Sequence, residues 1–165
     1  VILGNAGQRV ITAGEILSLA GLSAGFKTTQ KNEYDITVLR GPSITEVILS
    51  PRAIGFTSIE RPDVILALSQ EGVDRRKHLF DSLDNSVLIL QAPGVFLPSC
   101  NAEILRPNFK SQKIKTADWA LAALIILAKT NRIIHLEMLK TALQYKFENK
   151  ILKTSFDLIE RVMTD

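Results

Sequence analysis

The chain of 165 residues is 46% hydrophobic and 22% charged, a composition typical of a globular domain and unlike that of a disordered or fibrous protein. Its net charge of +3 is spread along the chain and does not indicate a nucleic-acid partner. The single cysteine, Cys100, excludes an internal disulfide, and the longest apolar run, residues 119–128, is shorter than the roughly 20 residues of a membrane span. We therefore expect a cytoplasmic domain without a signal peptide or a membrane partner.

Strand and helix patterns alternate over the first 115 residues. Short apolar or β-branched runs predict strands at 1–3, 26–30, 44–49, 63–68 and 86–90, with a further short strand at 113–115. Helical spacing predicts helices over 12–24, ended by Gly25, and over 70–83, and the remaining segments 31–43 and 92–110 read as loops. Because the chain begins inside a strand, we expect a few residues to precede Val1.

Three of the predicted strands, 1–3, 63–68 and 86–90, are apolar on both faces, which is typical of central strands in a parallel sheet. From residue 116 onward only helices are predicted, over 119–129, 135–147 and 150–163. The expected fold is a three-layer α/β/α sandwich with a mostly parallel, mixed central sheet and a C-terminal helical segment. We expect one domain over 1–165, with an α/β core at 1–115 and a helical part at 116–165.

The turn between the first strand and the first helix, Gly4–Arg9, is the first candidate site. A glycine-rich turn at a helix N-terminus presents backbone N–H groups that attract phosphate. The dinucleotide fingerprint requires glycines at 4, 6 and 9, but the chain has Ala6 and Arg9, and no Lys-Ser/Thr pair follows as in a P-loop. A close-packed strand-to-helix junction is at least as well supported as a ligand site.

Other reactive side chains form no catalytic set in the sequence. His78 and His135 lie on predicted helices without a partner at metal-ligand spacing, and Cys100 has no base beside it, so surface or packing roles are expected. The basic run 74–78 is interpreted as a solvated helix face, with an anion or partner contact as the alternative.

Three stretches in order resemble a known family: GNAGQRVITAGEIL at 4–17, EYDITVLRGPSITEVILSPRAIG at 33–55 and RPDVILALSQEGVDR at 61–75. They are similar to the gamma subunit, or gamma domain, of the 2-oxoacid:ferredoxin (acceptor) oxidoreductases, which cover pyruvate, 2-oxoglutarate, ketoisovalerate and indolepyruvate types. The matching residues are Gly4, Gly7, Gln8, Glu33, Tyr34, Arg40, Gly41, Ser43, Pro62 and Asp63. Glycines of the family are replaced by Ala6, Arg9, Asp35 and Pro42.

The resemblance implies a function in a complex. Such enzymes convert a 2-oxoacid and coenzyme A into acyl-CoA, CO2 and reduced ferredoxin or flavodoxin. Thiamine diphosphate, Mg and iron–sulfur clusters are expected on partner alpha, beta and possibly delta subunits, and none of them on this chain. The gamma part would pack on the catalytic subunits and border the coenzyme A site, with no nucleic-acid partner. The specific oxoacid does not follow from this subunit.

The resemblance also implies candidate site residues for a coenzyme A phosphate or a subunit contact: Gly4, Gly7, Gln8, Arg40 and Gly41. Arg9, which replaces a glycine of the family, is added to this set because it places a full charge and a bidentate donor at the start of the helix. For Arg40 an ion pair in the chain or at an interface is the favoured role, ahead of a ligand contact. Because the replaced glycines weaken any cradle, a stand-alone nucleotide- or CoA-binding regulatory module remains an alternative, and a dinucleotide dehydrogenase is a weaker one. The isolated chain is expected to have no oxidoreductase activity and no chromophore.

Overall fold

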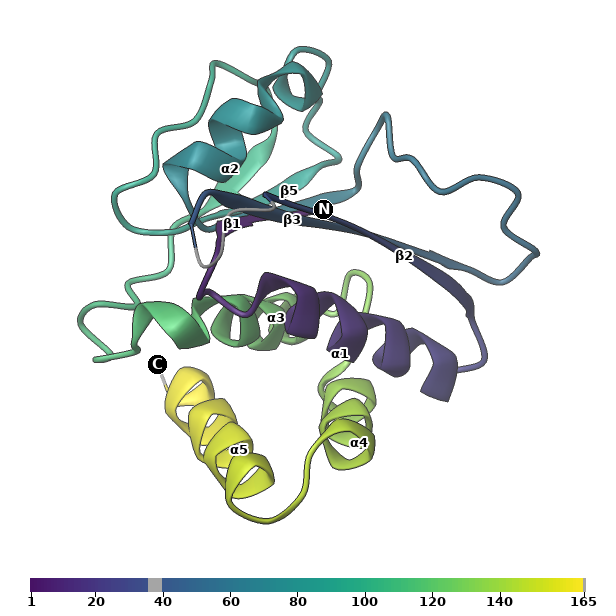
Figure 1. Ribbon diagram of the computed structural model, residues 1–165, viewed down its shortest axis with the longest axis vertical. Coiled ribbons are helices and arrows are strands. Elements are labelled where there is room, and N and C mark those ends of the chain that lie inside the picture. The colour runs from purple at the N-terminus through teal and green to yellow at the C-terminus, as the bar shows by residue number, and fades with distance from the viewer. Residues whose placement is uncertain (36–39, 165) are drawn as a thin grey trace.

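A computed structural model describes residues 1–35 and 40–164. Its centre is a six-stranded sheet with the order β2-β3-β1-β4-β5-β6 (Figure 1). The strands are β1 (Ile2–Asn5), β2 (Lys27–Tyr34), β3 (Pro42–Ser50), β4 (Val64–Ala67), β5 (Leu88–Gln91) and β6 (Glu103–Leu105). The helices are α1 (Val10–Ser23), α2 (Gln70–Arg75), α3 (Trp119–Thr130), α4 (Leu136–Lys146) and α5 (Asn149–Met163).

The sheet is parallel on one side of β1 and antiparallel on the other. β1, β4, β5 and β6 run parallel, whereas β3 is antiparallel to β1 and forms a long antiparallel hairpin with β2. The three strands predicted to be central, β1, β4 and β5, occupy adjacent positions inside the sheet, and Val64–Ala67 are each at most 7% exposed. The expected mixed sheet with these strands at its centre is confirmed.

The helices cover the two faces unequally. α1 and α3 lie on one face, and α4 and α5 form a further layer beneath them, whereas the other face carries the short α2 and the 3-10 turn Lys77–Phe80 (Figure 1). The α/β/α sandwich is therefore confirmed, and the C-terminal segment thickens one of its helical layers.

The helix α3 is the centre of the thick side of the molecule. Its first ten residues, WALAALIILA, are all apolar, eight of its twelve residues are buried, and it packs against α1, α4 and α5. This explains why a run of ten apolar residues occurs in a chain of average hydropathy, because α3 is a core helix covered on every side.

The expected loop at 31–43 is wrong at both ends. β2 continues to Tyr34 and β3 begins at Pro42, so the hairpin is much longer than its apolar residues indicate. The sequence KTTQKNEY contains no aliphatic residue because β2 is an edge strand with largely exposed side chains. The part of this expected loop at 36–39 lies outside the described residues.

Three further expectations need correction. The helix expected over 70–83 stops at Arg75, where the backbone leaves the helical region and a 3-10 turn follows. Residues 113–115 form no strand, because Lys113 adopts a left-handed φ of 53° that ends a turn. The strand β6 lies inside the proline-rich segment expected to be loop, since three residues paired with β5 give too short a pattern to detect.

Candidate functional site

The carboxyl ends of β1 and β4 meet beside the start of α1 and α2, at the edge of the sheet where ligands bind in open α/β folds. The turn Gly4–Arg9 lies there, between β1 and α1, together with Gly41 at the start of β3. The sequence predicts a candidate site on these segments, and the structure brings them together. It also shows how the polar groups of the turn are used.

Gln8 holds the turn closed. Its side chain is buried, with Oε1 accepting the N–H of Asn5 at 2.8 Å and Nε2 donating to the carbonyl of Leu68 at 3.1 Å. The N–H of Ala6 donates to the Gly41 carbonyl at 3.0 Å, and that of Gln8 donates to the Asn5 carbonyl at 3.1 Å. Three backbone N–H groups of the turn are thus directed to protein acceptors, which leaves them unavailable to a phosphate.

The fold requires a glycine at Gly4, Gly7 and Gly41, for a different reason at each end of the site. A Cβ on Gly4 would lie 2.5 Å from Val10 Cγ2, so this glycine permits close packing of β1 on α1. Gly7 and Gly41 both have a φ of +86°, which glycine adopts without cost. At Gly41 a Cβ would also lie 2.3 Å from Asp35 Oδ2. These requirements of the fold alone account for the three glycines.

Arg9 occupies a left-handed position, with a φ of 54°, immediately before α1. A glycine would adopt this conformation more readily, so the family's glycine here has a backbone reason. The guanidinium of Arg9 pairs with the Asp118 carboxylate at 3.0 Å and remains 64% exposed. Arg9 therefore connects the turn to the start of α3. Arg40 is exposed and forms no ion pair within the described ranges 1–35 and 40–164, so an interface partner for it stays a prediction.

Ser69 is a further polar residue of this edge that sequence reasoning did not single out. Its hydroxyl accepts the N–H of Gly72 at 3.0 Å, which caps α2, and donates to the Asn5 side chain at 2.8 Å. The serine directly after an apolar strand and before a helix was the available signal.

Two arginines of the basic run 74–78 form ion pairs that connect the end of α2 to strands β2 and β3. Arg76 is mostly buried, pairs with Glu33 of β2 and lies 3.7 Å from Glu46 of β3, and Arg75 pairs with Glu33 at 2.8 Å. The hydrogen bonds from Arg76, then from Arg75, lower the pKa of Glu33 below its usual value. The interpretation of this run as a solvated face is therefore wrong for Arg76, whereas His78 is exposed as expected.

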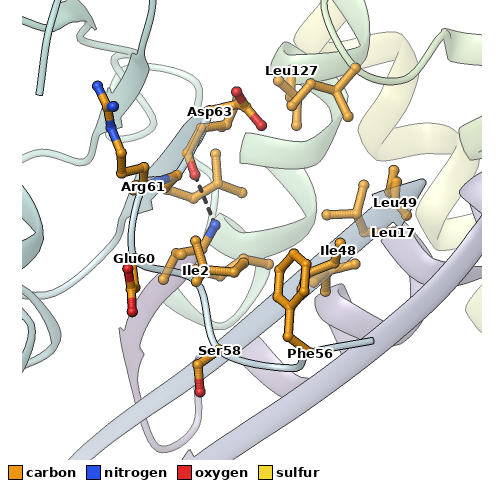
Figure 2. A pocket seen from close by; sticks show the side chains of 17 residues that line it. Ile2, Leu17, Ile48, Leu49, Phe56, Ser58, Glu60, Arg61, Asp63 and Leu127 are labelled. Carbon is orange, nitrogen blue, oxygen red and sulfur yellow. Dashed lines mark hydrogen bonds between the residues drawn. The ribbon is translucent and has the colours of Figure 1, made fainter. Parts of the chain in front are cut away.

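A cavity of about 660 Å³ lies at the opposite edge, beside the beginnings of β1 and β4. Figure 2 shows its apolar wall, formed by Ile2 and Ile48 of the sheet, Leu17 and Leu127 of the helices and Phe56 of the segment after β3. Arg61, Glu60 and Asp63 add charge to its lining. The sequence gives no pattern for this cavity, because it is assembled from six separate segments.

The described residues contain neither a cluster of His, Cys, Asp and Glu suited to a metal ion nor a helix with the length and apolarity to cross a bilayer. His78 and His135 are exposed and far apart in the fold, and Cys100 is half-buried in the loop after β5.

Curated relatives match the chain over part of its length. The 2-oxoglutarate synthase subunit KorC of Methanocaldococcus jannaschii is 35% identical over 75 residues, which are 45% of this chain and 40% of that protein. The KorC subunit of Methanothermobacter marburgensis is 33% identical over 73 residues, or 44% of this chain and 39% of that protein.

Solved structures share the fold over nearly the whole chain. The gamma subunit of a keto/oxoacid ferredoxin oxidoreductase from Geobacter sulfurreducens superposes with a TM-score of 0.76 at 21% identity, covering 99% of this chain and 97% of that one. The 2-oxoglutarate:ferredoxin oxidoreductase of Magnetococcus marinus gives 0.81 at 18% identity, covering 99% of this chain and 30% of that one. The sequence family described as pyruvate ferredoxin/flavodoxin oxidoreductase matches residues 1–164. The protein belongs to the pyruvate ferredoxin/flavodoxin oxidoreductase family.

Proposed function

We propose that the chain is the gamma subunit of a cytoplasmic, multi-subunit 2-oxoacid:acceptor oxidoreductase. The proposal rests on two findings that agree. The family matches residues 1–164, and a solved gamma subunit shares the fold of this chain over 97% of its own length. The complex would convert a 2-oxoacid and coenzyme A into acyl-CoA and CO2 and reduce ferredoxin or flavodoxin. Thiamine diphosphate, Mg and the iron–sulfur clusters would reside on the alpha, beta or delta subunits.

In this proposal the gamma chain packs on the catalytic subunits and borders the coenzyme A site. The Magnetococcus structure, which was determined with coenzyme A and succinyl-CoA bound, contains this fold as 30% of a longer chain, which supports a role beside the catalytic parts. In this proposal the main role of Gly4, Gly7, Gln8, Arg9, Arg40 and Gly41 is packing and subunit contact, and a phosphate contact is secondary. The internal hydrogen bonds of the turn and the Arg9–Asp118 pair support that order.

Reconstitution tests the assignment. The chain is co-expressed with the thiamine diphosphate-binding subunits encoded in the same organism, and the assay follows reduction of a viologen dye by a 2-oxoacid and coenzyme A. The expected result is a stable hetero-oligomer with activity, alongside a gamma chain that is colourless and inactive alone. A visible flavin or cluster band in the isolated chain, or its exclusion from the complex, contradicts the proposal. A monodisperse free chain that binds a nucleotide unaided favours the stand-alone module.

Calorimetric titration of coenzyme A at low salt tests the turn. We expect the isolated wild-type chain and Arg9→Ala to show no micromolar binding, since the turn's N–H groups are occupied and an exposed cation alone gives weak affinity. Arg52→Ala, which removes an exposed arginine elsewhere, is the matched control. Micromolar binding that is lost in Arg9→Ala but kept in Arg52→Ala would establish a phosphate site and overturn the packing role.

A further inference from the structure

Four of the chain's twenty lysines and arginines lie in one loop. The segment 106–115, RPNFKSQKIK, contains Arg106, Lys110, Lys113 and Lys115 and no acidic residue. All four are exposed, and within the described residues none of them forms an ion pair.

The loop is held rigidly from inside. Phe109 is fully buried and its ring centroid lies 5.6 Å from that of Trp119 at the start of α3. The Trp119 indole N–H donates to the Ile114 carbonyl at 3.1 Å, and the Ile114 N–H donates to the Phe109 carbonyl at 2.9 Å. The lysines are thus displayed from a packed base, at the green loop to the left of α3 in Figure 1. Because the loop is already held in place, its backbone loses little conformational entropy when the lysines bind a partner.

An exposed aromatic ring belongs to the same edge. Phe96 is 77% exposed, yet its backbone is fixed by the Gln70 side chain, which accepts the Phe96 N–H at 2.8 Å and donates to the Phe96 carbonyl at 3.2 Å. The Gln91 side chain donates to the Val95 carbonyl at 2.6 Å and accepts from Arg106 Nε at 3.0 Å. Gln91 thus connects the Phe96 loop to Arg106, the first cation of the segment.

We propose that this cationic edge, defined as Phe96 with Arg106, Lys110, Lys113 and Lys115, docks on an acidic face of a partner subunit. The inference rests on the proposed function and specifies which side of the chain faces the complex. A protein partner fits better than a small anion, because the four cations are exposed around a loop and none of them lines the cavity described above, which lies at the opposite edge of the sheet. A rigid aromatic beside a charged surface is the usual composition of an interface anchor and its rim.

Charge reversal in the reconstituted complex tests the proposal. Lys110→Glu with Lys115→Glu should slow association of the gamma chain with its partner subunits by about tenfold or more at low salt, with the difference shrinking as salt rises. The matched control reverses Lys150 and Lys153, which are exposed on α5, and should associate at the wild-type rate. Both variants should retain the wild-type melting temperature, because the altered side chains are exposed.

Two further measurements keep the outcomes distinct. Phe96→Ala should mainly speed dissociation, and zero-length carbodiimide cross-linking should join Lys110, Lys113 or Lys115 to carboxylates of a partner subunit. If the wild-type chain does not join the complex, the proposed function fails and this inference with it. If the wild type joins and the Lys110/Lys115 variant joins equally fast, only this inference fails. If assembly is unchanged and the KM for coenzyme A rises instead, the edge binds the polyanionic substrate and the protein-docking proposal is overturned.

Discussion

Replacing Gly72 by alanine tests how closely α2 packs against β1. A Cβ at this position would lie 2.7 Å from the Leu3 carbonyl carbon and 2.8 Å from the Gly4 nitrogen, so it would overlap backbone atoms that no side-chain rotation can move. Forcing a methyl group into a packed core costs about 1–3 kcal/mol, whereas alanine gains about 1 kcal/mol in a helix interior. Because Gly72 lies in the first turn and meets main chain, we expect the overlap to dominate.

The expected result for Gly72→Ala is a loss of about 1–2 kcal/mol in the free energy of unfolding, measured by urea denaturation with circular dichroism. Gly55→Ala is the control, because no atom lies within 4 Å of its added Cβ and its φ is outside the left-handed region. That variant should change the stability by less than about 1 kcal/mol. If Gly72→Ala is as stable as the wild type, α2 is free to move away from β1 and the argument from close packing is refuted.

Three other predictions concern single buried or paired groups. Ile65→Ala should cost about 2–5 kcal/mol by opening a cavity at a fully buried position, and a near-zero change in urea unfolding would contradict the central place of β4. Gln8→Ala should cost about 1–3 kcal/mol because it leaves the Leu68 carbonyl and a turn N–H without their partner, which thermal unfolding would detect. Because hydrogen bonds from Arg76 lower the pKa of Glu33, the wild type should exceed Glu33→Gln in stability above pH 4.5 and lose that advantage as pH falls through the lowered pKa; an advantage that grows in acid would contradict the pair.

Apolar strands and helices were the predictable part of the fold. β1, β4 and β5 are short, mainly apolar runs with buried side chains, and the first ten residues of α3 are all apolar, so the residue types alone predict that these segments are buried. The polar edge hairpin was underestimated because β2 is stabilised by its backbone pairing with β3, and side-chain pattern does not report that pairing.

The sequence predicted where the candidate site lies, but not which partners its polar side chains contact. The resemblance located the turn, and the fingerprint failure at Ala6 and Arg9 indicated that a phosphate cradle was doubtful. That Arg9 reaches Asp118 depends on where α3 begins, more than one hundred residues later. Likewise, the partners of Arg76 lie on strands whose pairing no local pattern specifies.

The burial of α3 on every side has a consequence for the order in which the molecule forms. Residues 1–115 alone would leave this face of the sheet covered by α1 only, and residues 116–165 alone would expose to water the surface of α3 that packs against α1. We therefore expect the chain to unfold in one cooperative transition, with the α3 amides exchanging with deuterium about as slowly as those of β4. A fragment ending at residue 115 should fail to fold, although it contains the whole sheet.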